Sequence, residues 1–300
     1  MKETIRPIPI AFLFPFLMAG CFHQKNGLFV ERYEDGTPRS EISWKDGLLD
    51  GVSRWYYRDG TIKAEVSFKA GKRHGIENVY DENGTRIHQI SWEKGKRHGI
   101  ELRWHENGRI YTSIPWKEGN MSGVLVTWDD DGRMQSERSF ENGKLHGTSI
   151  FYDDNGRKQR IVTFVDGYMH GPASWYAPDG SLIRIVHFVN GKEEGTETVY
   201  YRSGVRRGER NWKNGKRDGP ATMWYENGVR MCHAMWSADT LVGDPTWWYP
   251  NGKSMSSSPL HGKTLTLEEF WTASDPKAVT LSVLGNASEN SHQVKKRRGD

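Results

Sequence analysis

The sequence predicts an all-β fold in which tandem 24-residue β-hairpins form one elongated, twisted, open antiparallel sheet. Three observations lead to this prediction. Glycine recurs at every twenty-fourth position, the segments between the glycines alternate apolar and polar residues, and each segment carries an aromatic residue at a fixed place. A repeat that runs without insertions over most of a chain is typical of an array in which each unit contacts only its neighbours.

The first row of glycines marks one hairpin turn per unit. It runs from Gly36 to Gly252, once in every repeat, and Asp or Asn precedes the glycine in nine of the ten units. Such pairs supply the positive φ angles that tight turns need. We predict a three-residue loop, a type I turn followed by a glycine bulge, because an odd loop pairs even residues with even residues. A two-residue loop would instead pair Tyr56 with Lys63.

Two further glycine rows bracket a second turn, whose typical form is NGKLHG at residues 142–147. The second row runs from Gly47 to Gly215 and ends where Asp239 replaces glycine, and the third row runs from Gly27 to Gly243. Two turns per unit leave two segments of about seven residues, which is the length of a strand. Between Gly51 and Ala70 the apolar side chains stand at even numbers, so one face of each strand should be apolar. Because the repeat length is even, we expect this parity to hold along the chain.

Two aromatic rows should anchor the hairpins on this apolar face, a first row of Tyr or Trp from Tyr56 to Trp248 and a second row of Phe or Trp from Trp44 to Trp236. Two aromatic side chains bury too little surface to offset the entropy of ordering one unit, so neighbouring hairpins must pair and share their aromatic rows. The structural repeat aromatics are Tyr56, Phe68, Tyr80, Trp92, Trp104, Trp116, Trp128, Phe140, Tyr152, Phe164, Tyr176, Phe188, Tyr200, Trp212, Trp224, Trp236 and Trp248. Odd-numbered aromatics should lie on the opposite face, as a candidate binding surface, and are Trp55, Tyr57, Trp175, Tyr201, Tyr225, Trp247 and Tyr249.

These residues resemble the MORN repeat (membrane occupation and recognition nexus) in its bacterial variant. The pattern is carried by GVSRWYYRDG, SFKAGKRHG, GTETVYYRSG and NWKNGKRDG, and the resemblance covers residues 27–252. It implies a meander of hairpins in an elongated sheet, with a role in tethering, scaffolding or membrane-associated recognition and no shared catalytic residues. Some bacterial members are described as antitoxin-like. The export signal predicted below for residues 1–20 disfavours that role, because an antitoxin would neutralise its toxin in the cytoplasm.

Residues 1–20 are predicted to be a signal peptide of the lipoprotein type. A basic start with Lys2 and Arg6 precedes an apolar run that is too short for an ordinary membrane span. The ending LMAGC resembles a lipobox, in which Cys21 would carry the lipid; a plain secretory signal or an uncleaved anchor are the alternatives. Phe22 stands where Asp would indicate retention in the inner membrane, so an outer-membrane location in the cell envelope is favoured.

The remaining segments flank the array at residues 27–252. Residues 21–26 should form a short tether, residues 253–272 a C-terminal cap segment that contains TLTLEEFW, and residues 273–300 a disordered basic tail. The net charge is +4, of which the leader and the tail contribute +1 and +2, so the body is nearly neutral. Nucleic-acid binding is therefore not expected, because its affinity comes mainly from phosphate neutralisation.

Histidines at the second turn are the candidate metal ligands, and His74, His98, His146 and His170 share one position there. Equivalent residues in successive units are two strands apart, about 9–10 Å, which is too far for a shared tetrahedral zinc ion. We therefore expect no metal and no cofactor. A residue that recurs in every unit also does not form the asymmetric constellation that an active site needs, so no enzyme activity is expected.

The sequence thus predicts a non-catalytic, lipid-anchored scaffold or binding module for protein or membrane-associated partners. The alternative is a module that binds cell-wall polysaccharide or peptidoglycan, because solvent-facing aromatic residues at regular spacing can stack on sugar rings.

Overall fold

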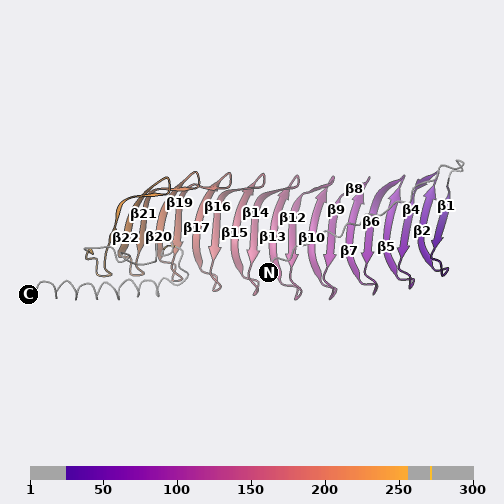
Figure 1. The fold of residues 1–300 in the computed structure, drawn as a ribbon, viewed down its shortest axis with the longest axis horizontal. Coiled ribbons are helices and arrows are strands. Elements are labelled where there is room, and N and C mark those ends of the chain that lie inside the picture. The colour runs from indigo at the N-terminus through magenta and orange to yellow at the C-terminus, as the bar shows by residue number, and fades with distance from the viewer. Residues whose placement is uncertain (1–24, 256–270, 272–300) are drawn as a thin grey trace, which may run out of the picture.

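The computed structural model describes residues 25–255 and Trp271, and residues 25–255 contain 23 β-strands. The strands lie side by side in one elongated layer that begins with β1 and ends with β23 (Figure 1). Every pairing is antiparallel and joins strands that follow one another in the chain, as β1 with β2 and β22 with β23, or that are separated only by a two-residue strand, as β2 with β4. This confirms the predicted all-β open meander. Among the described residues no helix has the length and apolar character needed to cross a membrane.

Each unit supplies a first strand, which four units split into two pieces, and a second strand. The first strands are β1 (Gly27–Arg32), β3 and β4 (Leu48–Leu49 and Gly51–Tyr56), β6 (Lys72–Tyr80), β8 and β9 (Lys96–Arg97 and Gly99–Trp104), β11 and β12 (Asn120–Met121 and Gly123–Trp128), β14 (Lys144–Tyr152), β16 (Tyr168–Tyr176), β18 and β19 (Lys192–Glu193 and Gly195–Tyr200), β21 (Lys216–Trp224) and β23 (Thr240–Trp247). The second strands are β2 (Pro38–Lys45), β5 (Ile62–Lys69), β7 (Arg86–Glu93), β10 (Ile110–Lys117), β13 (Met134–Glu141), β15 (Lys158–Val165), β17 (Leu182–Val189), β20 (Arg206–Lys213) and β22 (Arg230–Ser237).

The turn at the first glycine row is the predicted three-residue loop. The Gly60 N–H donates to the Tyr57 carbonyl at 3.1 Å, the Tyr57 N–H donates to the Thr61 carbonyl at 2.8 Å, and Gly60 has φ +88°. These bonds define a type I turn that ends in a glycine bulge.

The second turn is a two-residue loop in which both residues have positive φ, as Ala70 (47°) and Gly71 (76°) do. This is the pattern of a type I′ turn. Each turn is also tied to the preceding unit, since the Gly71 N–H donates to the Leu49 carbonyl at 2.8 Å. Asp239, which interrupts the glycine row, adopts φ 72° and its N–H donates to the Arg217 carbonyl at 2.9 Å. The backbone pattern therefore continues where the sequence pattern stops.

The third glycine row stands directly opposite the second aromatic row. Gly51 pairs with Phe68, and Gly75 pairs with Trp92 in the next unit. The same pairing extends to Gly219 in β21. These glycines have positive φ, +93° at Gly51 and +94° at Gly75, so they are required for the backbone conformation opposite each ring.

The predicted parity is wrong, because each hairpin contains a second bulge. Tyr56 pairs with Ile62, as the three-residue loop requires, but the next pair is Trp55 with Ala64, which leaves one residue of the second strand out of the register. Beyond this bulge, odd residues of the first strand face even residues of the second. Tyr56 and Phe68 therefore lie on opposite faces of the sheet, and the two aromatic rows do not share a face.

We name the two faces by their burial. The packed face is made of positions 53, 55, 64, 66 and 68 and their equivalents in the other units, and the open face of positions 52, 54, 56, 65 and 67 and theirs. Ser53, Ala64 and Val66 are at most 2% exposed, whereas Val52 is exposed on the other side.

The packed face is thickest near its C-terminal end, where Trp271 joins it. A cluster of buried residues there comprises Val199, Met223, Tyr225, Met231, Cys232, Trp247 and Trp271. The Arg207 guanidinium donates to the Trp271 carbonyl at 2.6 Å, which ties this part of the predicted cap segment to β20. The predicted signal peptide, Cys21, the rest of the cap beyond residue 255 and the basic tail lie outside the described residues.

Candidate functional site

The open face carries the first aromatic row as nine half-buried rings, one per unit. An arginine from the preceding second strand lies over the ring at three of these positions, Trp104, Trp224 and Trp248. The guanidinium carbon lies 4.5 Å from the ring centroid for Arg86 over Trp104, and 4.2 Å for Arg206 over Trp224. Such cation–π stacking orders both partners and covers one side of the ring. The row therefore links successive units along the sheet.

Tyrosines of this row are also held by glutamates of the same face. The Tyr56 hydroxyl donates to Glu41 at 2.8 Å, and the Tyr152 hydroxyl donates to Glu137 in the same way. Burial, and then the hydrogen bond to Glu137 with its negative charge, raise the pKa of Tyr152 to about 12. These phenols are thus neutral donors at ordinary pH, and carboxylates of the preceding strand hold them in place.

Aliphatic side chains form a second row on the open face, which we name the outer row. Its members are 39–57% exposed and are Leu28, Val52, Ile76, Ile100 and Val124. They stand two strands apart, about 9–10 Å. Two of the intervening serines use their hydroxyls within the sheet, since Ser43 donates to the Val52 carbonyl at 2.8 Å and Ser91 to the Ile100 carbonyl at 3.0 Å. The first five units therefore present a regular apolar stripe, whereas later units place Thr, Pro or Asp at this position.

The odd-numbered aromatics do not form one solvent-facing surface. Trp55, Trp175 and Trp247 lie on the packed face because of the second bulge, and Trp247 is fully buried. Tyr201 and Tyr225 are buried as well. Their predicted role as an exposed binding surface is therefore wrong for the three buried residues, which belong to the interior.

The tyrosines of this set lie at the first turn and connect units. The Tyr57 hydroxyl donates to the Tyr80 carbonyl at 2.9 Å, and Tyr201 and Tyr225 make the same bond to the next unit at 2.8 Å. Burial raises the pKa of Tyr201 and of Tyr225 to about 12. Tyr249 occupies the equivalent position in the last unit and is half-buried. These residues have a structural role that the sequence pattern did not separate from binding.

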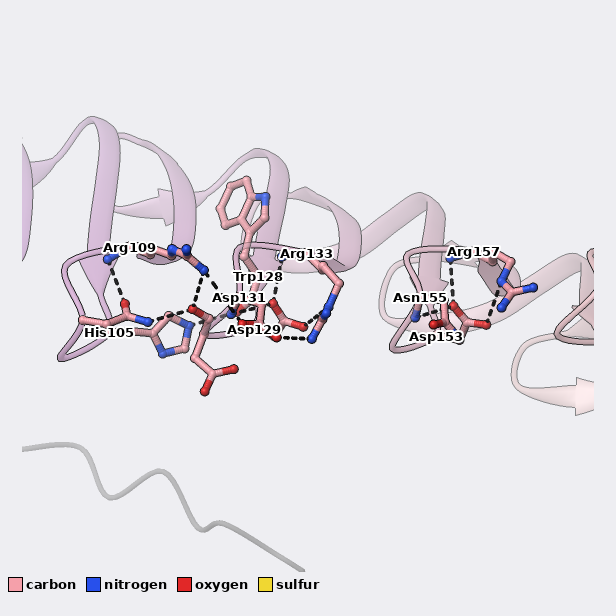
Figure 2. Close-up of polar contacts among 11 residues, drawn as sticks. His105, Arg109, Trp128, Asp129, Asp131, Arg133, Asp153, Asn155 and Arg157 are labelled. Atoms are coloured by element: carbon pink, nitrogen blue, oxygen red, sulfur yellow. Dashed lines mark hydrogen bonds and ion pairs between the residues drawn. The ribbon is translucent and has the colours of Figure 1, made fainter.

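Other units replace this tyrosine with histidine, aspartate or, at Ala177, alanine, and Figure 2 shows three turns with histidine or aspartate in succession. The His105 ring nitrogen Nε2 lies 3.2 Å from the Trp128 carbonyl, which reproduces the link to the next unit. Asp129 instead accepts from the backbone N–H of Arg133 at 2.8 Å and from its guanidinium at 2.9 Å. Asp153 binds its own turn in the same manner. The polar side chains of these first turns are therefore paired within the sheet.

Buried carboxylates on the packed face are the feature that the sequence analysis missed. Glu101 is fully buried and accepts hydrogen bonds from Arg103 and His88 at 2.8 Å, with Arg97 at 3.4 Å from its other oxygen. Burial alone would raise the pKa of Glu101, but these hydrogen bonds and arginine charges outweigh it and lower the pKa to about 2. Its repeat position, shared with the buried residues Ser53 and Ser149, was the available signal.

A second network of this kind surrounds Glu197, which is 1% exposed. Its carboxylate accepts from Arg184 at 2.7 Å, from Arg210 at 2.6 Å and from the Trp212 indole at 2.7 Å. Burial opposes ionisation, yet the two arginines and the indole hydrogen bond lower the pKa of Glu197. Arg210 also stacks on the rings of Trp212 and Trp271. These paired charges satisfy one another within the sheet, which indicates a structural function.

Turn histidines lie on the opposite edge of the sheet from the first turns, and their neighbours differ. His98 Nδ1 lies 3.6 Å from a carboxylate oxygen of Glu93 and 3.6 Å from one of Glu118. His146 Nε2 lies 3.6 Å from Glu141. The turns at His98 and His146 therefore differ in the number of carboxylates from residues 25–255 near the histidine, two at His98 and one at His146.

The family model described as the MORN repeat variant matches residues 49–70, 145–166, 169–190 and 193–214. The chain therefore carries MORN repeat variants in four places. These segments amount to less than a third of the chain, and the same hairpin geometry continues through the units between and beyond them. MORN repeats generally serve as binding scaffolds. No curated protein matches the chain.

Solved structures show only distant likeness. A TarM mutant from S. aureus, in complex with fondaparinux, α-GlcNAc-glycerol and UDP, is 18% identical over 32% of this chain and 19% of its own, with a TM-score of 0.24. The Glycosylation Associate Protein complex from Streptococcus agalactiae is 16% identical over 37% of this chain and 20% of that chain, with a TM-score of 0.24. The chain thus spans about a fifth of the length of these proteins.

Proposed function

We propose that this protein is a non-catalytic binding scaffold whose outer row docks a partner protein. The observation that carries the proposal is the row itself, in which five successive units place an exposed aliphatic residue at one position of the open face. Single exposed apolar residues are ordinary, but an ordered stripe of them is typical of an interaction surface. The complementary partner would present apolar side chains along an extended surface.

A protein partner is favoured over a polysaccharide because arginine side chains cover part of the aromatic surface on both faces. Sugar stacking needs a free flat side of the ring, and an arginine covers one of the two sides of Trp104 and of Trp224 on the open face. On the packed face Arg97 lies 4.7 Å from the Trp116 centroid, and Arg217 lies 3.9 Å from that of Trp236. Aliphatic side chains, in contrast, offer no stacking surface for sugars and pack well against protein.

A photo-crosslinking amino acid tests the docking surface. We would place it at Ile100, in the outer row, and at Thr196, the equivalent position of a unit outside the row, in two otherwise identical full-length chains. A discrete protein crosslink at residue 100 that is absent at residue 196, and that disappears when Val52 and Ile76 are replaced by Lys, is the expected result. Equal crosslinks at both positions would contradict the proposal, as would retention on purified sacculi that the Lys substitutions leave unchanged.

We further propose that Cys21 carries the lipid that holds the scaffold in the cell envelope, with the outer membrane favoured. The support is the sequence LMAGC after an apolar run and a basic start. Metabolic labelling with palmitate should mark the wild-type chain, and globomycin should block its processing. A Cys21→Ala variant with unchanged mobility, labelling and fractionation would refute the anchor while leaving the docking test intact.

A further inference from the structure

Three side chains that are candidate metal ligands converge between two neighbouring second turns. Glu93 is the last residue of β7, His98 directly precedes β9, and Glu118 directly follows β10 in the next unit. Their positions are set by the backbone. The His98 N–H donates to the Ser91 carbonyl at 3.0 Å, and Glu118 stands in a turn with φ 50°. The cluster therefore bridges two successive units, and an ion held there would contact both.

The distances fit a tetrahedral ion. With metal–ligand bonds of about 2.1 Å, the ligand atoms of a tetrahedral zinc site stand about 3.4 Å apart. His98 Nδ1 lies 3.6 Å from Glu93 Oε2 and 3.6 Å from Glu118 Oε1, and the three ligand atoms all lie within 4.8 Å of one another. Both glutamate side chains are substantially exposed, at 42% and 61%, so a change of side-chain rotamer can close the remaining gap.

The His98 ring nitrogen that faces both carboxylates makes no hydrogen bond, although the atom itself is shielded from solvent. At 3.6 Å neither carboxylate accepts a proton from it in a hydrogen bond. We propose that Glu93, His98 and Glu118 bind a divalent transition-metal ion, with Zn²⁺ as the best fit to one imidazole and two carboxylates and with water completing the tetrahedron. The sequence analysis expected no metal because it considered only the distance between histidines of successive units, and not the glutamates Glu93 and Glu118 that lie near His98.

Other turns provide a graded set of controls. At His146 the equivalent residues are Glu141 and Asp166, so a weaker second site with a shorter ligand is expected there. At His74 the equivalent residues are Lys69 and Lys94, which repel a cation. Lys96 lies 3.4 Å from the second oxygen of Glu118 and opposes the ion in the same way. Replacing Lys96 by Ala should therefore tighten binding.

Calorimetric titration of the full chain with ZnCl₂ at neutral pH tests the site. All variants would carry Cys21→Ser, because a free thiol at that position would itself bind zinc. His98→Gln should weaken the tightest site at least about tenfold, since even indirect ligand partners contribute that much. His74→Gln should leave it unchanged. An unchanged zinc affinity in His98→Gln, or equal losses in both variants, would overturn the proposal.

Two further measurements keep the test independent of folding. The pair Glu93→Gln with Glu118→Gln retains the turn histidine and should lose binding, and Co²⁺ in place of zinc should give the intense visible absorption of tetrahedral coordination only with the intact cluster. In a His98→Gln background, Lys69→Glu with Lys94→Glu should create a site at His74. Lys94 has φ 49°, as Glu118 has φ 50°, so the backbone already suits the change. A folded transplant that binds no zinc would exclude the carboxylates as ligands.

Discussion

Gly208 is expected to be required because Trp271 occupies the space of its missing side chain. A Cβ on Gly208 would stand 2.9 Å from Trp271 Cη2, 3.0 Å from Cζ3 and 3.1 Å from Val199 Cγ2. Among residues 25–255, the other glycines have positive φ, so their requirement is for backbone conformation. Gly208 does not, and its requirement is for volume.

The expected cost of Gly208→Ala is about 1–3 kcal/mol, the usual range for forcing an extra methyl group into a packed site. Trp271 is 4% exposed, so Trp271→Ala should cost about 3–5 kcal/mol. Once the indole is gone, only Val199 still crowds the new methyl group. Gly208→Ala should then be close to neutral, which gives a coupling of about 1–2 kcal/mol between the two changes.

Urea unfolding of the four chains of this double-mutant cycle, with hydrogen exchange in β20 as a local readout, measures the coupling. Gly204→Ala is the matched control. Its Cβ would meet nothing within 4 Å, but its φ is +83°, so its cost should be the same with and without Trp271. Additive effects of Gly208→Ala and Trp271→Ala would refute the reasoning that this glycine makes room for the indole.

Three more predictions follow from the same structure. The pKa of Glu101 is lowered from 4.5 to about 2, so its ionised form stabilises the fold fully above pH 4.5 and this stabilisation is lost as the pH falls toward 2. The contribution to the free energy of unfolding is about 3 kcal/mol, and Glu101→Gln should remove it from the pH dependence of stability. Wild-type and Glu101→Gln chains whose stability falls in parallel with pH would contradict this. Deleting one whole repeat, from Gly132 to Asn155, should preserve the fold with slightly lower stability, whereas a deletion one residue shorter should turn the downstream side chains to the other face of the sheet. Equal circular dichroism spectra and equal proteolysis of the two deletion variants would contradict this prediction. Burial raises the pKa of Cys232 to about 12, so its thiol should react slowly with iodoacetamide in the wild-type chain. Trp271→Ala should speed the alkylation, because Trp271 belongs to the buried cluster around Cys232. Rapid alkylation of the wild-type chain would contradict the burial of the thiol.

The repeat length, the strands and both turns could be predicted from the sequence because each depends on local chemistry. Asp-Gly and Asn-Gly specify the first turn at Gly60 through positive φ, and the two-residue loop at Gly71 follows from the same preference. Even the break at Asp239 has a local explanation, since aspartate tolerates a left-handed conformation better than most residues. The pairing of units followed from the small apolar area of a single hairpin.

The assignment of faces was decided by the tertiary structure. One residue left out of the register after Trp55 reverses the parity of the second strand, and nothing in the alternating pattern marks that bulge. This single shift sends Tyr56 to the open face and Phe68 to the packed face. It also buries Trp247, which the parity had placed on a binding surface.

Contacts between units were equally beyond the sequence pattern. A residue's partners two strands away depend on the register of both turns, so the convergence of Glu93 and Glu118 on His98 becomes visible only when adjacent hairpins are placed side by side. The sequence by itself determined the period, the turns and the strands, because each is encoded within one hairpin. The tertiary structure decided which side chains meet and which face is covered, because those depend on register between strands.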